Sequence, residues 1–230
     1  MKSKILKISK ILKRTFYKAQ WRNLRSTKPI SRVFGFDRGT PIDRVYIEDF
    51  LTRNRHLIRG TICEIGDDTY AKKFATEYEK IEVLHYTEGN PKATIVGDLT
   101  RPETLPKSSI DCFILTQTLN FIYDFKSAIK GVHYMLKPKG VVLATVAGIS
   151  QISRYDYERW GDYWRFTDMS IKRAFEEVFG TGNVEVFSYG NVLTAVALLE
   201  GISAEELTRD EIFYRDEDYP VVLAVKAVKR

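Results

Sequence analysis

Short apolar runs separated by segments of helix length dominate the pattern of this chain. Seven runs predict strands, at residues 61–65, 80–85, 93–96, 111–116, 141–146, 184–188 and 220–228. Helical periodicity and caps predict helices, at about 43–57, between the first two runs, at 125–135 and at 192–199. Strands that are apolar throughout and alternate with helices indicate a parallel sheet that is covered on both faces.

An acidic side chain stands at or near the end of each of the first three runs. Glu64 precedes Gly66 at the end of the first run, Glu82 and His85 lie in the second, and Asp98 follows the third. Ligands of open parallel sheets bind outside the carboxyl ends of the strands, so we expect these side chains along one crevice. A nucleoside-containing cofactor is the expected occupant.

The turn after the first predicted strand has a single glycine. Gly66 is followed by residues 67–70, Asp-Asp-Thr-Tyr, whereas phosphate- and nucleoside-binding turns usually have two or three glycines, which let the backbone approach the ligand. Two interpretations stay open. Either this acidic segment forms a variant turn that admits the cofactor, or the site has lost its binding function.

Length and composition are those of one α/β domain with a sizeable core. The chain has 230 residues, of which 44% are hydrophobic, and no run of eighteen apolar residues that would span a bilayer. No signal peptide is recognisable, so a cytoplasmic location is expected. The two cysteines, Cys63 and Cys112, lie in apolar runs, and we expect them to pack in the core. No metal site is predicted.

Positive charge is concentrated at the N-terminus. Residues 1–32 contain eleven Lys or Arg and no acid, which leaves 25 basic and 30 acidic residues in 33–230. Ile5, Ile8 and Phe16 recur at helical spacing among these bases. We therefore divide the chain into a basic amphipathic arm, 1–32, and a single domain, 33–230. The arm could dock on a partner, lie peripherally on a membrane through residues 1–26 or, as a weaker alternative, bind nucleic acid.

Several segments together carry a resemblance to a known family. They are residues 64–66, 97–99, 109–114 and the Leu-Lys-Pro-Lys-Gly turn at 136–140. In this order, over about 60–147, the chain resembles a class I S-adenosylmethionine-dependent methyltransferase. The resemblance implies a Rossmann-like, seven-stranded, mostly parallel sheet with helices on both faces and a reversed last strand. It also implies S-adenosylmethionine as cofactor.

Four further segments narrow the resemblance. Residues 36–46, 66–70, 88–91 and 160–167 resemble methyltransferases that are found beside or fused to glycosyltransferases of surface-polysaccharide biosynthesis. This closer resemblance implies a sugar or glycan acceptor, or a lipid-linked saccharide, and a glycosyltransferase partner.

The nucleoside end of such a cofactor needs two kinds of partner. The ribose hydroxyls need a carboxylate beyond the second strand, and Glu82 is the first candidate, with His85 second. The adenine amino group needs an acceptor, and Asp98 with the adjacent Leu99 backbone can frame the ring. Each of these acids could instead cap the helix that follows it.

The methionine end is zwitterionic and needs charges of both signs. Glu64 or Asp67 can act near its ammonium, while Arg44 or Arg38 can pair with its carboxylate. The full set of predicted cofactor-binding residues is Arg44, Glu64, Gly66, Asp67, Tyr70, Glu82, His85, Asp98, Leu99 and Gln117.

Methyl transfer to a hydroxyl requires alignment and removal of a proton. The segment after the fifth strand offers Asp162 as the first candidate base, followed by Asp156, and His133 in the preceding helix is third. The aromatic density of this segment suits stacking on sugar rings. The predicted substrate-binding residues are Tyr155, Trp160, Tyr163, Trp164 and Arg165.

Three functions follow from these observations. The first is a methyltransferase that O-methylates a sugar hydroxyl of a glycan or lipid-linked saccharide. The second is an RNA-directed methyltransferase, in which the arm binds phosphates. The third is a non-catalytic methyltransferase-like partner of a glycosyltransferase, which the depleted glycine turn would favour. No Asn/Asp-Pro-Pro-aromatic motif follows the fourth strand, which disfavours methylation of a base amino group.

Overall fold

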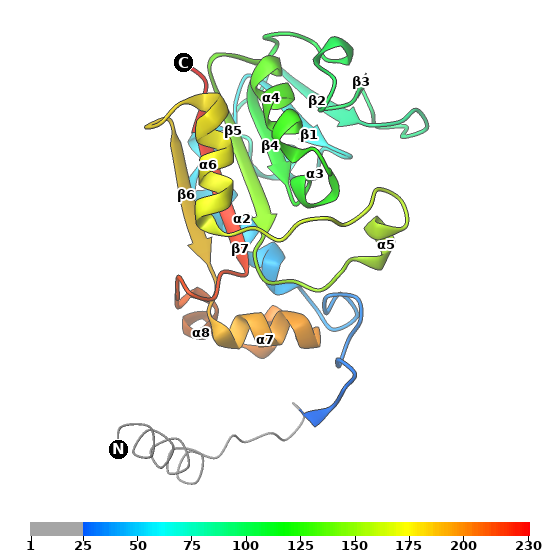
Figure 1. Ribbon diagram of the computed structural model, residues 1–230, viewed down its shortest axis with the longest axis vertical. Helices are drawn as coiled ribbons and strands as arrows, with labels where there is room; N and C mark the ends of the chain where they lie inside the picture. Colours follow the sequence, from blue (N-terminus) through cyan, green and yellow to red (C-terminus); the bar gives the residue numbers. More distant parts are fainter. Residues whose placement is uncertain (1–24) are drawn as a thin grey trace, which may run out of the picture. The chain divides into compact units, whose positions relative to one another are not determined.

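The computed structural model describes residues 25–230 (Figure 1). Residues Ser31–Arg230 form a compact unit. The Ser31 N–H donates to the Glu200 carbonyl at 2.9 Å, and its hydroxyl donates to Asp37 at 2.5 Å, so the chain is held from this residue onward. The predicted arm lies almost wholly outside the described residues, and its division from the domain at residue 32 stays a prediction.

A seven-stranded sheet organises this unit. Its strands are β1 Thr61–Ile65, β2 Lys80–His85, β3 Ile95–Val96, β4 Ile110–Thr116, β5 Leu136–Ala147, β6 Val184–Tyr189 and β7 Val222–Val228. Their order is β3-β2-β1-β4-β5-β7-β6. All pairs are parallel except those of β7, which runs antiparallel to both β5 and β6. The predicted Rossmann-like fold with a reversed last strand is confirmed.

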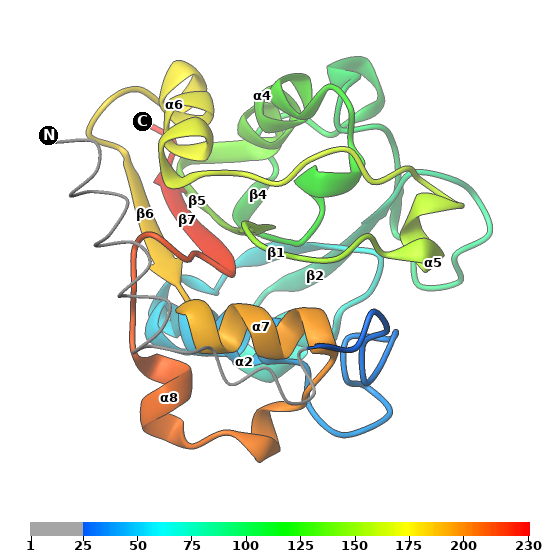
Figure 2. The ribbon, with the colours of Figure 1, turned by 60° about the horizontal axis from the view of Figure 1, so that its bottom comes forward.

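Helices cover both faces of the sheet (Figure 2). One face carries α4 Phe125–Met135 and α6 Asp168–Phe179. The other carries α2 Ile42–Arg53, α3 Thr69–Phe74, α7 Val192–Glu200 and α8 Arg209–Phe213. A short helix, α5 Arg154–Tyr157, lies in the segment after β5. Short 3-10 turns are η2 Arg55–Leu57, η3 Pro102–Thr104, η4 Leu119–Phe121 and η5 Ala204–Glu206.

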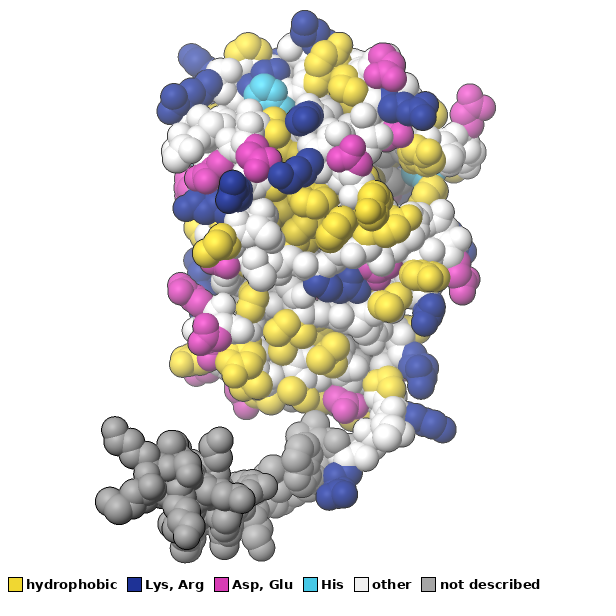
Figure 3. Space-filling view, viewed as in Figure 1, with side chains coloured by type: hydrophobic (Ala, Val, Ile, Leu, Met, Phe, Trp, Pro, Cys, Tyr) yellow, Lys and Arg dark blue, Asp and Glu magenta, His cyan; other side chains and the backbone are white. Residues whose placement is uncertain are grey.

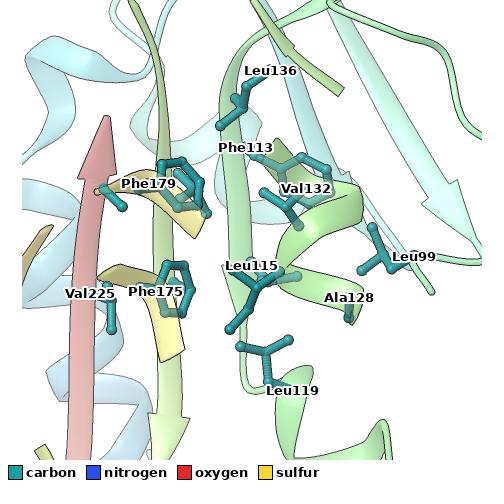
Figure 4. Packing of buried hydrophobic residues seen from close by; sticks show 14 of the residues in the cluster. Leu99, Phe113, Leu115, Leu119, Ala128, Val132, Leu136, Phe175, Phe179 and Val225 are labelled. Atoms are coloured by element: carbon teal, nitrogen blue, oxygen red, sulfur yellow. The ribbon is translucent and has the colours of Figure 1, made fainter. Parts of the chain in front are cut away.

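The core consists of two layers, one on each side of the sheet. Successive side chains of a strand point to opposite faces. Accordingly, Phe113 and Leu115 pack under α4 and α6, while Cys112 and Ile114 pack on the other face. Figure 4 shows Phe113 and Leu115 beside α4, with Phe175 of α6 across the same layer. Both layers are apolar, which explains why the strands read as continuous apolar runs. The cysteines are free and buried, as predicted.

Four elements differ from the sequence expectations. The first predicted helix ends at Arg53 and continues as η2, and the third predicted strand shortens to Ile95–Val96. β5 begins at Leu136, earlier than the predicted start at residue 141, because the residues around Pro138 lie within a shift of register between β4 and β5. Lys139 has a left-handed φ of 67° there. Helix α6 was not predicted, although Thr167 and Ser170 form a capping box at its start.

Strand order places a switch point between β1 and β4. The chain moves outward from β1 to β2 and β3, then returns to the other side of β1 as β4. Such a reversal opens a crevice at the carboxyl ends of the strands. Within residues 25–230, no helix is both long enough and apolar enough to cross a membrane.

Candidate functional site

A crevice of about 600 Å³ lies at the carboxyl ends of β1, β2 and β4. This volume is within the usual range for small-molecule sites. Its wall includes five of the ten predicted cofactor-binding residues, which come from four strand ends: Gly66, His85, Asp98, Leu99 and Gln117.

Gly66 gives the crevice an open stretch of backbone. It has a left-handed φ of 79°, and a Cβ added there would meet no atom within 4 Å. The turn is held from both sides, because the Gly66 N–H donates to the Leu84 carbonyl at 3.0 Å and Asn90 Nδ2 donates to the Gly66 carbonyl at 2.7 Å. The single glycine therefore leaves room for a ligand to approach the backbone at the end of β1.

Glu64 supports the turn from behind and does not line the crevice. Its carboxylate is only 4% exposed and accepts the N–H groups of Tyr70 at 3.1 Å and Ala71 at 2.7 Å. Burial outweighs these hydrogen bonds and raises its pKa to about 7. The structure gives Glu64 a structural role at the start of α3, and its predicted action near the cofactor ammonium stays a prediction.

Two other residues of this turn are also directed away from the crevice. Asp67 accepts the Thr69 N–H at 2.9 Å in a local turn. The Tyr70 ring is buried against Phe74, with ring centroids 6.0 Å apart, and burial raises its pKa to about 12. Neither side chain lines the crevice, so their predicted cofactor contacts are not supported by the geometry.

At the end of β2, His85 stands where Glu82 was predicted to act. Glu82 lies three residues before the strand end, where it pairs with Lys80 at 2.5 Å and accepts a hydrogen bond from Thr94. It does not line the crevice, whereas His85 does. The His85 ring meets Trp160 edge to face, with centroids 5.7 Å apart. The geometry therefore favours His85 over Glu82 at this strand end, because the strand continues beyond Glu82, and a ribose contact of either residue stays a prediction.

Asp98 and Leu99 occupy the third strand end. One Asp98 carboxylate oxygen accepts the Thr100 N–H and hydroxyl, each at 2.8 Å, and the other is 3.9 Å from Arg101. This second oxygen keeps acceptor capacity, and Asp98 lines the crevice. The Leu99 backbone is fixed by α4, since a Cβ on Gly131 would approach the Leu99 carbonyl oxygen to 2.0 Å.

The two arginines predicted for the cofactor carboxylate are engaged elsewhere. Arg38 forms a two-bond ion pair with Glu206, at 2.9 and 2.5 Å. Arg44 is exposed, and its guanidinium carbon lies 5.2 Å from the centre of the Phe36 ring. Neither residue lines the crevice, so the geometry does not support a contact of either one with the cofactor carboxylate.

The segment between β5 and α6, residues 148–167, forms a lid that is locked by an internal ion pair. The Asp162 side chain is 1% exposed, and its two oxygens accept from Arg165 at 2.5 and 3.0 Å. It also accepts the Ser153 N–H at 3.1 Å, while Arg165 donates to the Gln151 carbonyl at 2.6 Å. This ion pair holds both side chains in place, so Asp162 is less free to take a proton than an unpaired carboxylate. Both residues also line the second cavity described next, and their predicted roles as base and substrate contact stay predictions.

A second cavity of about 460 Å³ adjoins the crevice beneath the lid. Gln117, Phe121 and Asp156 line both spaces. Asp156 accepts the Ser153 hydroxyl at 2.6 Å. Asp43, at the start of α2, also lines the second cavity. Its carboxylate accepts the Arg44 N–H at 2.9 Å, and burial raises its pKa.

Aromatic side chains rim these spaces. Trp160, Tyr163 and the unpredicted Tyr123 line the crevice, and Tyr155 lines the second cavity. The Tyr123 ring is 71% exposed and meets Tyr163 edge to face at 5.4 Å. Exposed hydrophobic side chains also gather near the middle of the face shown in Figure 3.

Two predicted site residues belong to the packing instead. The Trp164 indole N–H donates to the Tyr123 carbonyl at 3.1 Å and its ring meets Phe125 edge to face at 5.4 Å. His133 packs against Phe179 at 4.9 Å, and burial lowers its pKa. Neither residue lines the crevice or the second cavity, so the geometry does not support Trp164 as a substrate contact or His133 as a base.

Sequence reasoning missed three residues of the site. Tyr86 follows β2 directly and lines the crevice, so its position was a usable signal. Tyr123 and Asp43 carried none, because only the fold brings the segment after η4 and the start of α2 to the strand ends. Among residues 25–230, no group of three His, Cys, Asp or Glu could hold a metal ion.

Comparison with known proteins agrees with this geometry. Residues 62–144 match a family model described as a methyltransferase domain, Methyltransf_11. A search of curated proteins finds no match.

Three solved structures share the fold at low sequence identity. A SAM-dependent methyltransferase from Archaeoglobus fulgidus is 14% identical, with a TM-score of 0.52 over 81% of this chain and 94% of its own. A Mesorhizobium loti S-adenosylmethionine-dependent methyltransferase is 16% identical, with a TM-score of 0.50 over 82% and 98%. Phosphoethanolamine N-methyltransferase 2 of Haemonchus contortus, in complex with S-adenosyl-L-methionine, is 15% identical, with a TM-score of 0.52 over 79% and 52%.

S-adenosylmethionine is the cofactor named for all three structures, which agrees with the predicted cofactor. By its fold and by the match over residues 62–144, this chain has the architecture of a class I S-adenosylmethionine-dependent methyltransferase.

Proposed function

We propose that this protein is a methyltransferase that transfers the methyl group of S-adenosylmethionine to a hydroxyl of a saccharide. One observation carries the proposal. A crevice at the switch point, with open backbone at Gly66 and polar groups at His85 and Asp98, joins a second cavity that is lined by three carboxylates, Asp43, Asp156 and the arginine-bound Asp162.

The crevice residues fit the parts of this cofactor in the order of the strands. Asp98 keeps one carboxylate oxygen to accept from the adenine amino group, beside the fixed backbone of Leu99. His85 stands at the next strand end, where its ring can meet the ribose. Gly66 leaves the backbone open for the methionine chain. This order runs along the sheet edge from β3 through β2 to β1.

The chain's own residues need only position the acceptor and take its proton. The bound cofactor supplies an activated methyl group. Asp156 lines both spaces and is the better candidate base now that Asp162 is bound by Arg165. Asp43 faces the same cavity with a raised pKa, which moves it toward the range where a base accepts protons efficiently near neutral pH.

Two observations indicate which kind of molecule accepts the methyl group. They are the exposed aromatic side chains around the two cavities and the resemblance to methyltransferases of surface-polysaccharide assembly. Tyr123, Tyr155 and Tyr163 are each at least half exposed around the two spaces. Flat aromatic faces beside carboxylates suit a sugar ring, whose C–H face stacks while its hydroxyls donate hydrogen bonds. This arrangement favours a sugar hydroxyl as the methyl acceptor over RNA, whose phosphate backbone is charged.

Calorimetry with S-adenosylmethionine and its demethylated product tests the first step. We expect both to bind, and Asp98→Asn to weaken binding about tenfold, because the oxygen that faces adenine becomes a donor while the turn to Thr100 is kept. Glu185→Ala on exposed β6 is the matched control and should bind like the parent. Absence of heat and of thermal shift for the parent with both ligands would overturn the enzyme proposal and leave the non-catalytic alternative.

The acceptor is tested with a radiolabelled methyl donor and glycans from the producing cell. We expect label in saccharide that depends on the protein, and a strong decrease with Asp156→Asn, by roughly 10²–10⁴-fold if this residue is the base. Label that enters RNA instead of glycan would support the RNA-directed alternative and contradict this proposal.

Residues 1–26 are the segment through which we expect the protein to contact other components of the cell. We propose a glycosyltransferase partner and peripheral contact with an anionic membrane through this basic segment. Deleting it should abolish co-sedimentation with vesicles that contain anionic lipid and leave cofactor affinity unchanged, and each neutralised base should weaken binding by about 1 kcal/mol. Equal sedimentation of full-length and truncated protein would contradict the membrane contact.

A further inference from the structure

An unpaired amide donor lies just beyond the end of β4. Nε2 of Gln117 is buried and has no hydrogen-bond partner among residues 25–230. Its Oε1 accepts from Asn120 Nδ2 at 3.0 Å, and Asn120 is itself fixed, because its Oδ1 accepts the Ala147 N–H at 3.3 Å. Asn120 therefore determines the orientation of the amide. The acceptor side is used, and the NH₂ group is left with two free donors.

The backbone of the same residue is strained. Gln117 has a left-handed φ of 46°, which non-glycine residues seldom adopt, and its N–H donates to the Thr145 carbonyl at 2.8 Å. An unpaired buried donor and a strained backbone both destabilise the fold locally. Gln117 also lines both the crevice and the second cavity. Such a coincidence indicates a residue that is retained for a ligand.

Strand order shows which part of the ligand would meet this donor. Gln117 follows β4, on the opposite side of β1 from β2 and β3, where His85 and Asp98 face the nucleoside. A cofactor that extends along this edge places its amino acid end between β1 and β4. Its ammonium has no lone pair, and the positive charge of its sulfonium makes the sulfur a poor acceptor, whereas its carboxylate accepts hydrogen bonds strongly.

We propose that the Gln117 side-chain amide donates to the carboxylate of S-adenosylmethionine. This inference rests on the proposed function and names the group that recognises one end of its cofactor. The guanidinium that lines the crevice does not compete for this role. It belongs to Arg159, which lies 3.5 Å from the centre of the Tyr155 ring and donates to the Tyr155 carbonyl at 2.7 Å.

The test compares S-adenosylmethionine with decarboxylated S-adenosylmethionine, which keeps the sulfonium and the ammonium. Calorimetry measures both ligands on the parent, on Gln117→Leu and on Gln117→Glu. Leucine removes the donor, while glutamate keeps the bond from Asn120 and presents an acceptor in place of the NH₂ group. We expect each variant to weaken binding of the carboxylate-bearing ligand about tenfold or more and to leave the decarboxylated ligand unchanged.

Thermal unfolding without ligand shows that both variants are folded before binding is compared. Equal weakening of both ligands would assign Gln117 a structural role, and unchanged affinity for both would show that the amide makes no contact; either result overturns the inference. If the parent binds neither ligand, the proposed function fails as well. If the parent binds both and the variants bind like the parent, the proposed function stands and the assignment of Gln117 fails.

Discussion

Glu64→Gln should change how the stability of the protein depends on pH. Glu64 is buried behind the Gly66 turn, and burial raises its pKa from the ordinary 4.5 to about 7. An acid whose pKa is higher in the folded state stabilises that state most when it is protonated. Its contribution is therefore complete below pH 4.5 and is lost as the pH rises through about 7.

The size of the effect follows from the same two values. The interval from 4.5 to about 7 corresponds to about 3 kcal/mol, of which about 2 to 3 kcal/mol falls between pH 5 and pH 8. Glutamine carries no charge and contributes no such slope. It also leaves one of the two N–H groups, from Tyr70 or Ala71, without an acceptor, a penalty of about 1–3 kcal/mol that does not change with pH.

Urea unfolding of parent and variant at pH 5, 6, 7 and 8 measures the difference directly. The variant should be less stable than the parent at pH 5 and should gain about 2 to 3 kcal/mol relative to it by pH 8. All other titrating groups are common to both proteins, so their contributions cancel in the difference between the two free energies of unfolding. Parallel stability curves would refute the reasoning, because they would mean that Glu64 has the same pKa in the folded and unfolded chain.

Three further substitutions test the fold around the site. Gly131→Ala should destabilise the protein by about 1–3 kcal/mol in urea unfolding and weaken cofactor binding, because its Cβ would displace the Leu99 backbone; an unaffected protein would contradict this packing. Arg165→Met should cost about 3–5 kcal/mol, since it leaves buried Asp162 unpaired; a loss within experimental error would contradict this role of the ion pair. Trp160→Ala should leave stability within about 0.5 kcal/mol of the parent and weaken cofactor binding, and unchanged affinity would exclude a role of its ring.

The sheet could be predicted because both of its layers are apolar. Strands such as Ile110–Thr116 are buried on both faces, so their apolar runs identify them without knowledge of their partners. Helix α6 was missed although Thr167 and Ser170 cap it, because its sequence follows an irregular segment whose end no apolar run marks. Residue type alone therefore predicted the positions of the strands well, but it predicted poorly the structure of the irregular connections between them.

The candidate site could be predicted only where a residue's position in its strand was already certain. Gly66 and Asp98 lie one and two residues beyond strand ends, and both line the crevice. Glu82 does not line it because β2 continues to His85, and the sequence alone does not show which residue ends the strand. The ion pair of Asp162 with Arg165 joins residues only three apart, but the aromatic, acidic composition of the lid did not indicate it.

A crystal structure with the demethylated cofactor, S-adenosylhomocysteine, would show where the cofactor binds. We expect one molecule in the crevice, with adenine beside Asp98 and Leu99, ribose at His85 and the amino acid end over Gly66 within hydrogen-bond distance of Gln117. Ligand density in the second cavity alone, or an empty crevice at a concentration that saturates known methyltransferases of this fold, would contradict it.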